Sequence, residues 1–494
     1  MYQILIDGAW VRAHEGPTRD VTNPATLEPL GTVPECGPDD VARAVGAARA
    51  AQSEWRRVPA TGRATLLSEI GGRIRARERE FATLLTRETG KPLCESVDCI
   101  NGVVALFEAC GAVAAAAPGT SNPQGASHQV SCPLQQPAGV VAAIAPFNFP
   151  LLLMACMVAP AIAAGNTVVC KPPHQNPLTS LRLAEVYDAL PAGVVNVITG
   201  GPDTGRALVD HPDVGLVTFT GSAVVGRMIA AAAQRKRVDL ELGSVDAFIV
   251  CKDANLDLTV PGVAWARLLN GGQVCTSGKH IYVERSIVAE FVERIHHCVG
   301  FLDVDDPMKP LTDLGPLISL EAARRVEDQV GRSLRDGATL VLGGRRFRPS
   351  GLPGHFFQPT ILSNVRTGSV PTHEEILGPV ITITPVADAA EAIRLASESG
   401  SVFGASIYTS DPRAVMKAVE SVKAGTFRIN EPATAINAGP FGGMRHGGFR
   451  RALGAEGADA FQQPTHVQVA ELMQRKPWWF PYRNRALPGG RVVG

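Results

Sequence analysis

Cys275 is the residue in this chain whose neighbours best suit a nucleophile. It lies in the stretch 268–277, where Gly271, Gly272 and Gln273 precede it. The thiolate is the reactive form of cysteine, and a free thiol titrates near pH ~8.5, so a working nucleophile needs a polarising neighbour or a base. The two glycines allow the backbone to approach a substrate closely. A buried cysteine is more often a small hydrophobic residue, so further residues of a site must be sought elsewhere in the chain.

Polar residues at the ends of predicted strands supply further chemistry. Glu241 lies near the end of the apolar strand 238–242, where a carboxylate is either exposed or a general base. Gly221 and Ser222 follow a strand and open a helix, which directs N–H groups and the positive helix end at an anion such as a pyrophosphate. The same two residues also fit a plain strand-to-helix turn. Lys171 closes an apolar strand and is either solvated or a donor to ribose hydroxyls.

These residues belong to an alternation of strands and helices. Apolar strands are expected at 140–144, 167–171, 194–198, 216–220 and 238–242, with helices beginning at Leu151, Leu178, Asp203 and Ser222. Apolar strands separated by helices of this length predict right-handed βαβ units and a parallel sheet covered on both faces. Such a doubly wound sheet binds ligands at the carboxyl ends of its strands, where the polar residues lie.

Other predicted elements flank this alternation. A strand at 4–10 and helices near 39–48, 66–74 and 81–85 precede it. A second α/β region follows it, with helices at 256–269, 286–299, 320–334, 389–397 and from 412, and strands at 280–283, 339–342, 380–385, 404–408 and 426–429. The Pro- and Ser-rich stretch 118–136, with a short strand at 128–132, and a strand from Thr465 lie outside both regions.

Length and composition indicate a large protein with several domains. The 494 residues exceed what one hydrophobic core supports, and about 150 residues per domain suggests about two to four units. The 47 basic and 47 acidic residues balance, which predicts no nucleic-acid partner and no anionic membrane partner. Aromatic residues make up only 5 %, which favours helices packed on parallel sheets over a β-sandwich.

The start of the sequence and its cysteines predict a cytoplasmic protein without a metal site. No basic and apolar leader is visible, and the apolar stretch 150–164 is too short and interrupted to span a bilayer. The ten cysteines are spread singly, so reduced thiols are expected. Neither Cys94 with Cys99 nor the run 296–298 has the spacing of a zinc site, and ordinary polar helix residues are expected at 296 and 297.

Seven short motifs occur in one order along the chain. They are Pro-Phe-Asn-Phe-Pro at 146–150, Gly-Asn-Thr-Val-Val-Cys-Lys-Pro at 165–172, Phe-Thr-Gly-Ser at 219–222, Glu-Leu-Gly at 241–243, Gly-Gln-Val-Cys at 272–275, Glu-Ile-Leu-Gly-Pro-Val at 375–380 and Pro-Phe-Gly-Gly at 440–443. In order and spacing they resemble the motifs of the aldehyde dehydrogenase superfamily nearly end to end. The resemblance is to its NAD(P)-dependent, hydrolytic members.

The resemblance implies a reaction for the motif residues. Cys275 attacks the carbonyl of a small-molecule aldehyde and forms a thiohemiacetal, whose oxyanion is held by the Asn148 side-chain amide and the Cys275 backbone N–H. One such donor is typically worth ~3 to 4 kcal/mol of barrier. After hydride transfer to the nicotinamide, Glu241 activates the water that hydrolyses the thioester to the free carboxylic acid.

The resemblance also implies a site for NAD, with NADP tolerated. Glu375 holds the nicotinamide ribose, Leu377 borders the ring, Lys171 serves the adenosine ribose, and Gly221 with Ser222 receives the pyrophosphate. The expected cofactor site is completed by Phe147, His174 and Gly243.

Three positions depart from the family pattern. His174 stands where NAD-preferring members often carry an acid that repels a 2′-phosphate, so we expect NAD to be only slightly favoured over NADP. A preference for NAD above about a thousandfold, or roughly 4 kcal/mol, would contradict this. Ser244 replaces a second glycine after Glu241 and limits how that carboxylate swings. Ala452 replaces a glutamate that assists the base, which predicts slower deacylation.

By matched position, the substrate pocket is lined by Leu153, Cys156, Leu269 and Ala435. These side chains are apolar and mostly not aromatic, which predicts a roomier pocket than acetaldehyde needs. Succinate-semialdehyde enzymes usually have an arginine where Cys156 stands, which argues against that substrate. A trimethylammonium aldehyde would need an aromatic cage, which is also missing at these positions. Nearby cations either meet an anionic substrate or form a solvated face: Arg267, Arg445 and His446.

The resemblance implies a fold in three parts. These are a doubly wound parallel-sheet cofactor domain (1–118 and 138–243), a second α/β catalytic domain (244–460), and a small β oligomerisation element with the tail (119–137 and 461–494). Homodimers or homotetramers are expected. Three alternatives stay open: CoA-dependent release of the thioester, which Glu241 disfavours; a cysteine hydrolase or esterase; and a noncatalytic binding or structural member of the fold, which the presence of Cys275, Glu241 and Asn148 together disfavours.

Overall fold

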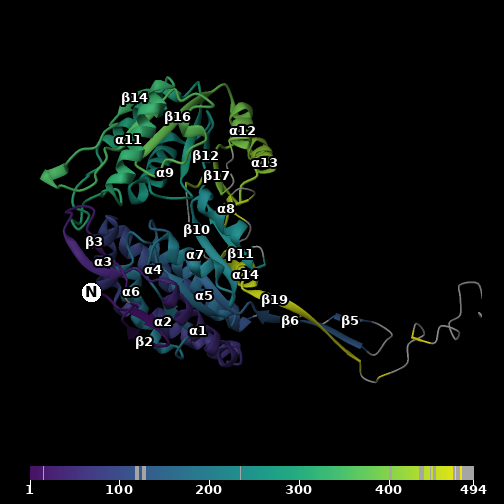
Figure 1. Cartoon of the computed structure of the whole chain (residues 1–494). Helices are drawn as coiled ribbons and strands as arrows, with labels where there is room; N and C mark the ends of the chain where they lie inside the picture. Colours follow the sequence, from purple (N-terminus) through teal and green to yellow (C-terminus); the bar gives the residue numbers. More distant parts are fainter. Residues whose placement is uncertain are drawn as a thin grey trace, which may run out of the picture. The chain divides into compact units, whose positions relative to one another are not determined.

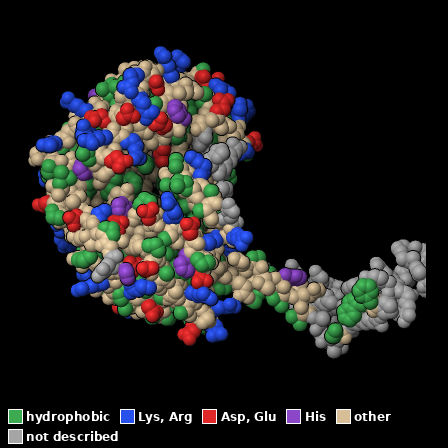
Figure 2. Space-filling view, viewed as in Figure 1, with side chains coloured by type: hydrophobic (Ala, Val, Ile, Leu, Met, Phe, Trp, Pro, Cys, Tyr) green, Lys and Arg blue, Asp and Glu red, His purple; other side chains and the backbone are tan. Residues whose placement is uncertain are grey.

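The chain forms two compact units (Figure 1). The computed structural model describes residues 1–14, 16–116, 122–124, 129–233, 235–399, 403–432, 439–444, 447–448, 452–470, 473 and 479–480. The larger unit consists of Met1–Ala115 and Pro137–Phe461, and the smaller of Ala116–Gln136 and Gln462–Gly494. On the face shown in Figure 2, basic and acidic side chains are interspersed over the surface.

A seven-stranded sheet organises the first half of the larger unit. Its strands, in spatial order, are β11 (Arg237–Leu242), β10 (Val214–Gly221), β7 (Val140–Ile144), β8 (Thr167–Lys171), β9 (Val195–Val197), β1 (Ile4–Ile6) and β2 (Ala9–Val11). From β11 to β9 all neighbours are parallel. Because β7 lies between β8 and β10, the strand order reverses there, as in a doubly wound sheet. The predicted fold class is therefore confirmed.

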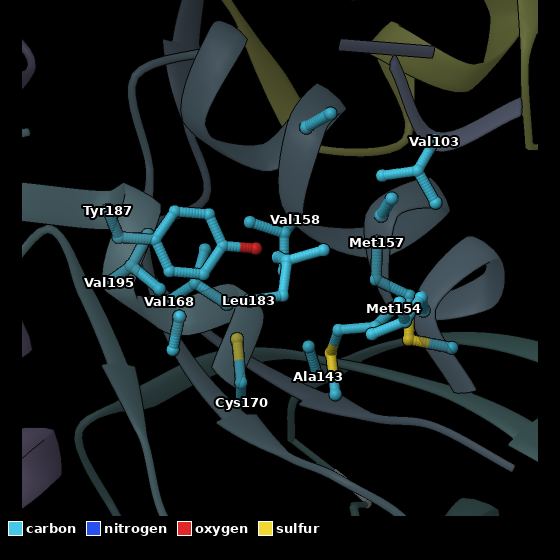
Figure 3. Close-up of a cluster of buried hydrophobic side chains, with 14 of the residues drawn as sticks. Val103, Ala143, Met154, Met157, Val158, Val168, Cys170, Leu183, Tyr187 and Val195 are labelled. Atoms are coloured by element: carbon cyan, nitrogen blue, oxygen red, sulfur yellow. The ribbon is translucent and has the colours of Figure 1, made fainter. Parts of the chain in front are cut away.

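Helices cover both faces of this sheet because successive strand residues point to opposite sides. On one face, Val141 and Ala143 pack against the first group of helices: α2 (Ala60–Ala76), α3 (Glu78–Thr89), α4 (Leu93–Ala116), α5 (Pro150–Ala163) and α6 (Leu178–Leu183), which the 3₁₀ turn η1 (Ala184–Ala189) extends. Figure 3 shows this cluster, with Met154 and Val158 of α5 above strand residues such as Cys170. On the other face, Val140 packs against the second group: α1 (Pro38–Trp55), α7 (Pro202–Asp210) and α8 (Ala223–Ala232).

Residues 4–11 form a hairpin rather than the single strand predicted at 4–10. The strands β1 and β2 pair antiparallel, with Ile6 opposite Ala9. Between them Asp7 and Gly8 have φ angles of 54° and 72°. A two-residue hairpin turn requires this left-handed backbone at both positions, and Asp-Gly is a strong signal for it. The sequence interpretation missed that signal.

The helix α4 is the main helix that was not predicted. It is 24 residues long and apolar over most of its length, so no helical periodicity marks it in the sequence. It is longer than the apolar stretch 150–164. Among the described residues it is the one helix that is long and apolar enough to cross a membrane. Its side chains Ile100, Val103 and Phe107 are fully buried in the hydrophobic cluster of the first sheet. The helix therefore serves as a core helix of the larger unit.

A second seven-stranded sheet organises the rest of the larger unit. Its strands, in spatial order, are β14 (Thr339–Leu342), β15 (Thr360–Ser363), β16 (Val380–Val386), β13 (Gly278–Glu284), β12 (Asp246–Val250), β17 (Gly404–Tyr408) and β18 (Thr426–Ile429). Only β14 runs antiparallel to its neighbour. The strands β12 and β15 were not predicted, although they are short and fully buried like the predicted strands β7 and β8.

Helices also cover both faces of the second sheet (Figure 1). One cluster of buried side chains joins the sheet to α9 (Leu256–Leu268) and α10 (Val288–Gly300), and another joins its other face to α12 (Ala389–Glu398) and α13 (Pro412–Ser421). The helix α11 (Leu320–Arg335) packs in a smaller cluster with β15 and β16.

Two small antiparallel sheets complete the described structure. The hairpin of β3 (Thr18–Thr22) and β4 (Pro29–Pro34) belongs to the larger unit. In the smaller unit the order is β19 (Gln462–Ala470), β6 (Gln129–Pro137) and β5 (Asn122–Gln124). Within it, Ser131 Oγ and His466 Nε2 are 2.7 Å apart.

Candidate active site

One cavity of about 880 Å³ in the larger unit brings the predicted catalytic and cofactor residues together. Its walls come from the carboxyl ends of strands in the first sheet, from α7, α8 and α11, and from loops that adjoin the second sheet. The predicted residues in its lining are Phe147, Asn148, Lys171, His174, Gly221, Ser222, Glu241, Gly243, Cys275, Glu375 and Leu377. The volume is within the ~300 to 1,000 Å³ of sites that hold a drug-sized ligand or cofactor.

The turn before Cys275 has an unusual backbone. Asn270, Gly271 and Gly272 have φ angles of 53°, 62° and 74°, which are left-handed values in three consecutive residues. The sequence predicts that the two glycines allow a close approach of substrate, which stays a prediction. In the structure a Cβ atom on Gly272 would lie 2.0 Å from the Gly378 carbonyl oxygen, whereas the nearest atom to one on Gly271 would be 3.6 Å away. Gly272 is needed where two protein backbones meet.

Asn148 is tied to the same turn. Its Nδ2 donates to the Gln273 backbone carbonyl oxygen at 3.0 Å, and the Asn148 backbone carbonyl oxygen accepts from Asn270 Nδ2 at 2.9 Å. An amide nitrogen carries two hydrogens, and this bond uses one of them. The side chain is buried, so these contacts fix its position beside the nucleophile turn.

Burial dominates the electrostatics of Cys275. It raises the pKa of the thiol to about 12, the ammonium group of Lys279 opposes the rise, and the carboxylates of Glu375, Glu241 and Asp246 add to it. The thiol is therefore protonated near neutral pH. Nucleophilic attack requires a base, or a positive charge brought into the cavity, to form the thiolate.

Lys279 links Cys275 to the predicted ribose-binding residue. Its ammonium group donates to the Cys275 carbonyl oxygen and lies 3.1 Å from Glu375 Oε1. The Lys279 side chain is only 2 % exposed, so this ion pair is shielded from water. Sequence reasoning missed Lys279, although a cation four residues after the nucleophile is a visible signal.

Glu241 is held at the end of β11. Thr220 lies opposite it in the parallel pairing of β10 with β11, and Thr220 Oγ1 donates to Glu241 Oε2 at 3.2 Å. The Glu241 side chain is buried yet lines the cavity. The carboxylate thus faces the same space as Cys275, in a position set by strand register.

Glycine at 243 and 221 gives this end of the sheet its shape. A Cβ atom on Gly243 would lie 2.2 Å from Glu375 Oε2, so the missing side chain lets that carboxylate approach the end of β11. A Cβ atom on Gly221 would lie 2.4 Å from the Phe219 ring. Ser222 then caps α8, and its Oγ accepts from Val225 N at 3.3 Å. A helix N-terminus next to two glycines suits a pyrophosphate.

Ser244 and Ala452, the two departures near Glu241, are outside the cavity lining. Ser244 Oγ donates to Asp246 Oδ1 at 2.7 Å, which anchors the residue after Gly243. Ala452 exchanges two backbone hydrogen bonds with Phe441, each 2.6 Å long. The Phe441 ring packs edge-on against Phe403, which lines the cavity, so these rings connect Ala452 to the site.

The far end of the cavity carries a cluster of charges around His174. Its Nε2 lies 3.0 Å from Glu35 Oε1, and the same oxygen accepts from Arg19 Nε at 3.1 Å. Lys171 is buried, and burial lowers its pKa to about 8. Neither Glu35 nor Arg19 was singled out from the sequence, because each is more than a hundred residues from His174.

Two further groups that sequence reasoning missed support the nucleophile turn from behind. Glu95 Oε2 of α4 accepts from Asn270 N at 2.9 Å. Burial raises the pKa of Glu95 to about 7. The ammonium group of Lys91 is fully buried and lies 3.5 Å from the centroid of the Phe149 ring, next to Asn148. A lysine just before α4 and a glutamate in its first turn gave no signal in the sequence, because the helix itself was not predicted.

Arg267 is neither solvated nor directed at a substrate, and both expectations for it were wrong. It is fully buried and donates to Gly272 O at 3.1 Å and to Ile376 O at 2.8 Å. It therefore ties the nucleophile turn to the loop that carries Glu375. Arg445 and His446 lie outside the described residues.

Three of the predicted substrate-pocket residues lie outside the lining of the large cavity. Leu153, Cys156 and Leu269 are absent from its lining, and Ala435 lies outside the described residues. Cys156 is nonetheless close enough to Glu241 for that carboxylate to contribute to its raised pKa, after burial. The pocket assignment stays a prediction. No group of metal-ligating side chains occurs among the residues the structure describes.

Comparison with known proteins places this geometry. The family model described as Aldehyde dehydrogenase family matches residues 10–467. The chain is 36 % identical over 488 residues to a phenylacetaldehyde dehydrogenase of Pseudomonas fluorescens (95 % of this chain, 96 % of the relative). It is 35 % identical over 461 residues to a succinate-semialdehyde dehydrogenase (NADP+) of Escherichia coli strain K12 (92 % and 94 %).

A solved structure agrees with these relatives. The betaine aldehyde dehydrogenase of Staphylococcus aureus in complex with NAD+ superposes with a TM-score of 0.93, at 30 % identity and 97 % coverage of both chains. Its bound NAD+ and the NADP+ in the name of the Escherichia coli relative indicate the cofactor class. The chain belongs to the aldehyde dehydrogenase family and is an NAD(P)-dependent aldehyde dehydrogenase that oxidises an aldehyde to the acid.

Proposed function

We propose that Cys275, Asn148 and Glu241 carry out this oxidation. The observation that carries the proposal is that all three line one cavity together with Glu375. The Cys275 thiolate, left when the thiol gives up its proton to a base, attacks the carbonyl carbon, and the carbonyl electron pair moves to oxygen to give the thiohemiacetal anion. The second amide hydrogen of Asn148 and the Cys275 backbone N–H stabilise the oxyanion, at about 3 to 4 kcal/mol for one such donor.

Glu241 is the base of the second half-reaction. Nicotinamide, when bound, accepts the hydride that the thiohemiacetal loses. Glu241 then takes a proton from a water molecule as the water oxygen attacks the thioester carbon. The carbon–sulfur bond breaks, which releases the acid and the Cys275 thiolate. A CoA-dependent release of the thioester needs no such base, so Glu241 favours hydrolysis.

The residues of the cavity fit a nicotinamide cofactor. Gly243 and Gly221 remove the Cβ atoms that would collide with Glu375 and the Phe219 ring, which leaves an open cradle at the strand ends. Glu375 would hold the nicotinamide ribose beside Leu377, and Gly221 with Ser222 would receive the pyrophosphate. The cofactor site is completed by Phe147, Lys171, His174 and Gly243, with Lys171 and His174 at the adenosine ribose.

The substrate is proposed only as a class. Leu153, Cys156, Leu269 and Ala435 suggest an apolar pocket that suits a larger aldehyde than acetaldehyde. Named relatives act on succinate semialdehyde and phenylacetaldehyde, which differ in charge and shape. We favour an uncharged aliphatic or aromatic aldehyde, because all four of these side chains are apolar. A panel of aliphatic, aromatic, phosphorylated and semialdehyde substrates, each with both cofactors, tests this.

We also propose the three-part organisation and its consequence for assembly. The compactness of the smaller unit supports an oligomerisation element at 119–137 and 461–494, beside a cofactor domain (1–118 and 138–243) and a catalytic domain (244–460). A homodimer or homotetramer follows, and sedimentation analysis of the full chain against one lacking residues 471–494 tests it. Ten unpaired cysteines fit a cytoplasmic location.

The central experiment separates binding from chemistry. Cys275→Ala should abolish aldehyde oxidation and leave NAD+ binding intact, because its thiol is needed only for the covalent step. Cys298→Ala, which removes a half-buried thiol of α10, serves as a thiol control that should keep the oxidation. Full activity of the Cys275→Ala protein would refute the assignment. Titration of Cys275 by a thiol reagent, with protection by NAD+, tests whether the thiol and the cofactor share the cavity.

A further inference from the structure

The charges behind His174 form a cluster built from three separate segments. Arg19 comes from β3, Glu35 follows β4, and His174 follows β8. His174 lines the cavity, whereas Glu35 and Arg19 do not. The N-terminal hairpin therefore supplies a second layer of charge behind the residue that faces the expected adenosine ribose.

Glu35 fixes how the imidazole is presented. Its Oε1 lies 3.0 Å from His174 Nε2 and also accepts from Arg19 Nε at 3.1 Å, while the Arg19 guanidinium also donates to the His174 carbonyl oxygen. A carboxylate that accepts from one imidazole nitrogen sets the tautomer, so a neutral His174 carries its proton on Nε2. The lone pair on Nδ1 is then an acceptor for a ligand.

The two protonation states of this imidazole have opposite binding preferences. With its proton on Nε2, Nδ1 can accept a hydrogen bond from a hydroxyl group. When both nitrogens carry protons, Nδ1 becomes a charged donor, which suits a phosphate oxygen. A ribose 2′-hydroxyl is what distinguishes NAD from NADP, which has a 2′-phosphate at that position.

Burial and the surrounding charges act on the protonation of this imidazole in opposite directions. Burial and the positive charge of Arg19 lower the pKa of His174, and Glu35 opposes them. Lys171 faces it from the end of β8 and also lowers that pKa. Arg206 of α7 lines the same cavity. At neutral pH His174 is therefore neutral in the cofactor-free protein, and a nearby phosphate dianion would favour its protonation.

We propose that Glu35 and His174 form a proton-linked selector for the 2′ position of the adenosine ribose. A neutral His174 accepts from the 2′-hydroxyl of NAD, and a protonated His174, flanked by Lys171 and Arg206, binds the 2′-phosphate of NADP. Glu35 is a positioning residue that orients the imidazole and adds a negative charge that disfavours the phosphate. The inference rests on the proposed cofactor site and adds to it a dependence on pH.

Calorimetric binding of NAD+ and NADP+ to the full-length protein tests the selector without turnover. Between about pH 8 and about pH 6 the ratio of the NADP+ to the NAD+ dissociation constant should fall about tenfold, since one coupled proton contributes up to about tenfold per pH unit. Repeating the titrations in buffers with different heats of ionisation should show more proton uptake with NADP+ than with NAD+.

The variant His174→Gln separates the imidazole from the ligand. The 2′-phosphate itself titrates near pH ~6, and this variant keeps that contribution while losing the imidazole. Its affinity ratio should therefore change less with pH than that of the wild type, and its extra proton uptake should shrink. An identical pH dependence in the two proteins would overturn the proposal.

The variant Glu35→Gln tests the positioning role. At about pH 8 it should gain roughly threefold in NADP+ affinity relative to NAD+, because a negative charge is removed near the phosphate. Its ratio should also vary less with pH, because His174 loses the partner that favours its protonation. Glu28→Gln, an exposed glutamate on the turn of the same hairpin, is the matched control and should behave as wild type.

The outcomes separate this inference from the proposed function. Equal behaviour of Glu35→Gln and Glu28→Gln would overturn the role of Glu35 while leaving NAD+ binding intact. Failure of the wild-type protein to bind NAD+ at all would instead refute the proposed cofactor site.

Discussion

Gly272 offers a direct test of how the nucleophile turn is held. In Gly272→Ala the new Cβ atom would lie 2.0 Å from Gly378 O and 2.4 Å from Gly378 C, whereas ordinary contact begins at 3.4 Å. Two backbone segments must therefore move apart by more than an ångström. One segment carries Cys275, and the other follows Glu375 and Leu377. The change should displace both Cys275 and the proposed cofactor residues Glu375 and Leu377.

The adjacent glycine provides the matched control. Gly271 has a similar left-handed backbone, with a φ angle of 62° against 74°, but an added Cβ atom there would meet nothing within 3.6 Å. Both alanine variants therefore pay the left-handed conformational cost of about 1 to 2 kcal/mol. Only Gly272→Ala adds the collision with Gly378.

The expected result is a large difference in activity between two neighbouring substitutions. A misplacement of about 1 Å can cost about 10²-fold in rate, so kcat/KM for Gly272→Ala should fall about 10²-fold below that of Gly271→Ala. Steady-state kinetics with one aldehyde, thermal unfolding and NAD+ binding measure the comparison. If Gly272→Ala does not fold while Gly271→Ala does, the close approach is equally supported. Equal kcat/KM values in two folded variants would refute it.

Three further predictions concern the groups around the turn. Because the thiol pKa is about 12, the rate of alkylation of Cys275 by iodoacetamide in the cofactor-free protein should rise about tenfold per pH unit between about pH 7 and about pH 10. Mass spectrometry of the Cys275 peptide measures this rate. A plateau in the rate below about pH 8 would contradict the prediction. Because the carboxyl of Glu95 titrates at about 7 and accepts from Asn270 N when ionised, kcat should fall as pH drops through that value, and Glu95→Gln should lose this limb with NAD+ affinity unchanged. With alanine at 452, rapid mixing should give a burst of NADH equal to the active sites, and a linear progress curve would argue against slow deacylation.

The elements that could be predicted are those with local boundaries. The strands β7 and β8 were predicted at their observed residues because each is an apolar run closed by glycine, proline or lysine. The Asp7-Gly8 pair also signals the hairpin in the sequence, but the alternating residues around it predict a single strand. The helix α4 was not predicted, because it is apolar over most of its length and lacks the polar period that reveals a helix. The strand β12 was missed although it is as fully buried as β7 and β8.

The candidate site divides in the same way. Residues that face the cavity, such as Asn148, Glu241 and Cys275, lie in short motifs at strand ends and turns. Residues that hold them from behind do not. Glu35 meets His174 across 139 positions, and Glu95 meets Asn270 across 175, so no local pattern could pair them. Arg267 was misjudged for the same reason, because burial depends on a neighbouring loop more than a hundred residues away.

The ion pair of Lys279 would couple the ionisation of Cys275 to cofactor binding at the proposed ribose-binding residue Glu375. One ammonium group is shared between Glu375 and the Cys275 carbonyl oxygen in a site with little water. If the nicotinamide ribose hydrogen-bonds Glu375 as proposed, it would weaken the hold of Glu375 on Lys279 and leave more of the positive charge for the sulfur. By reciprocity, whatever factor the cofactor contributes to forming the thiolate, the thiolate returns to cofactor affinity. A single buried lysine would thereby favour cofactor binding before aldehyde, with no moving domain required.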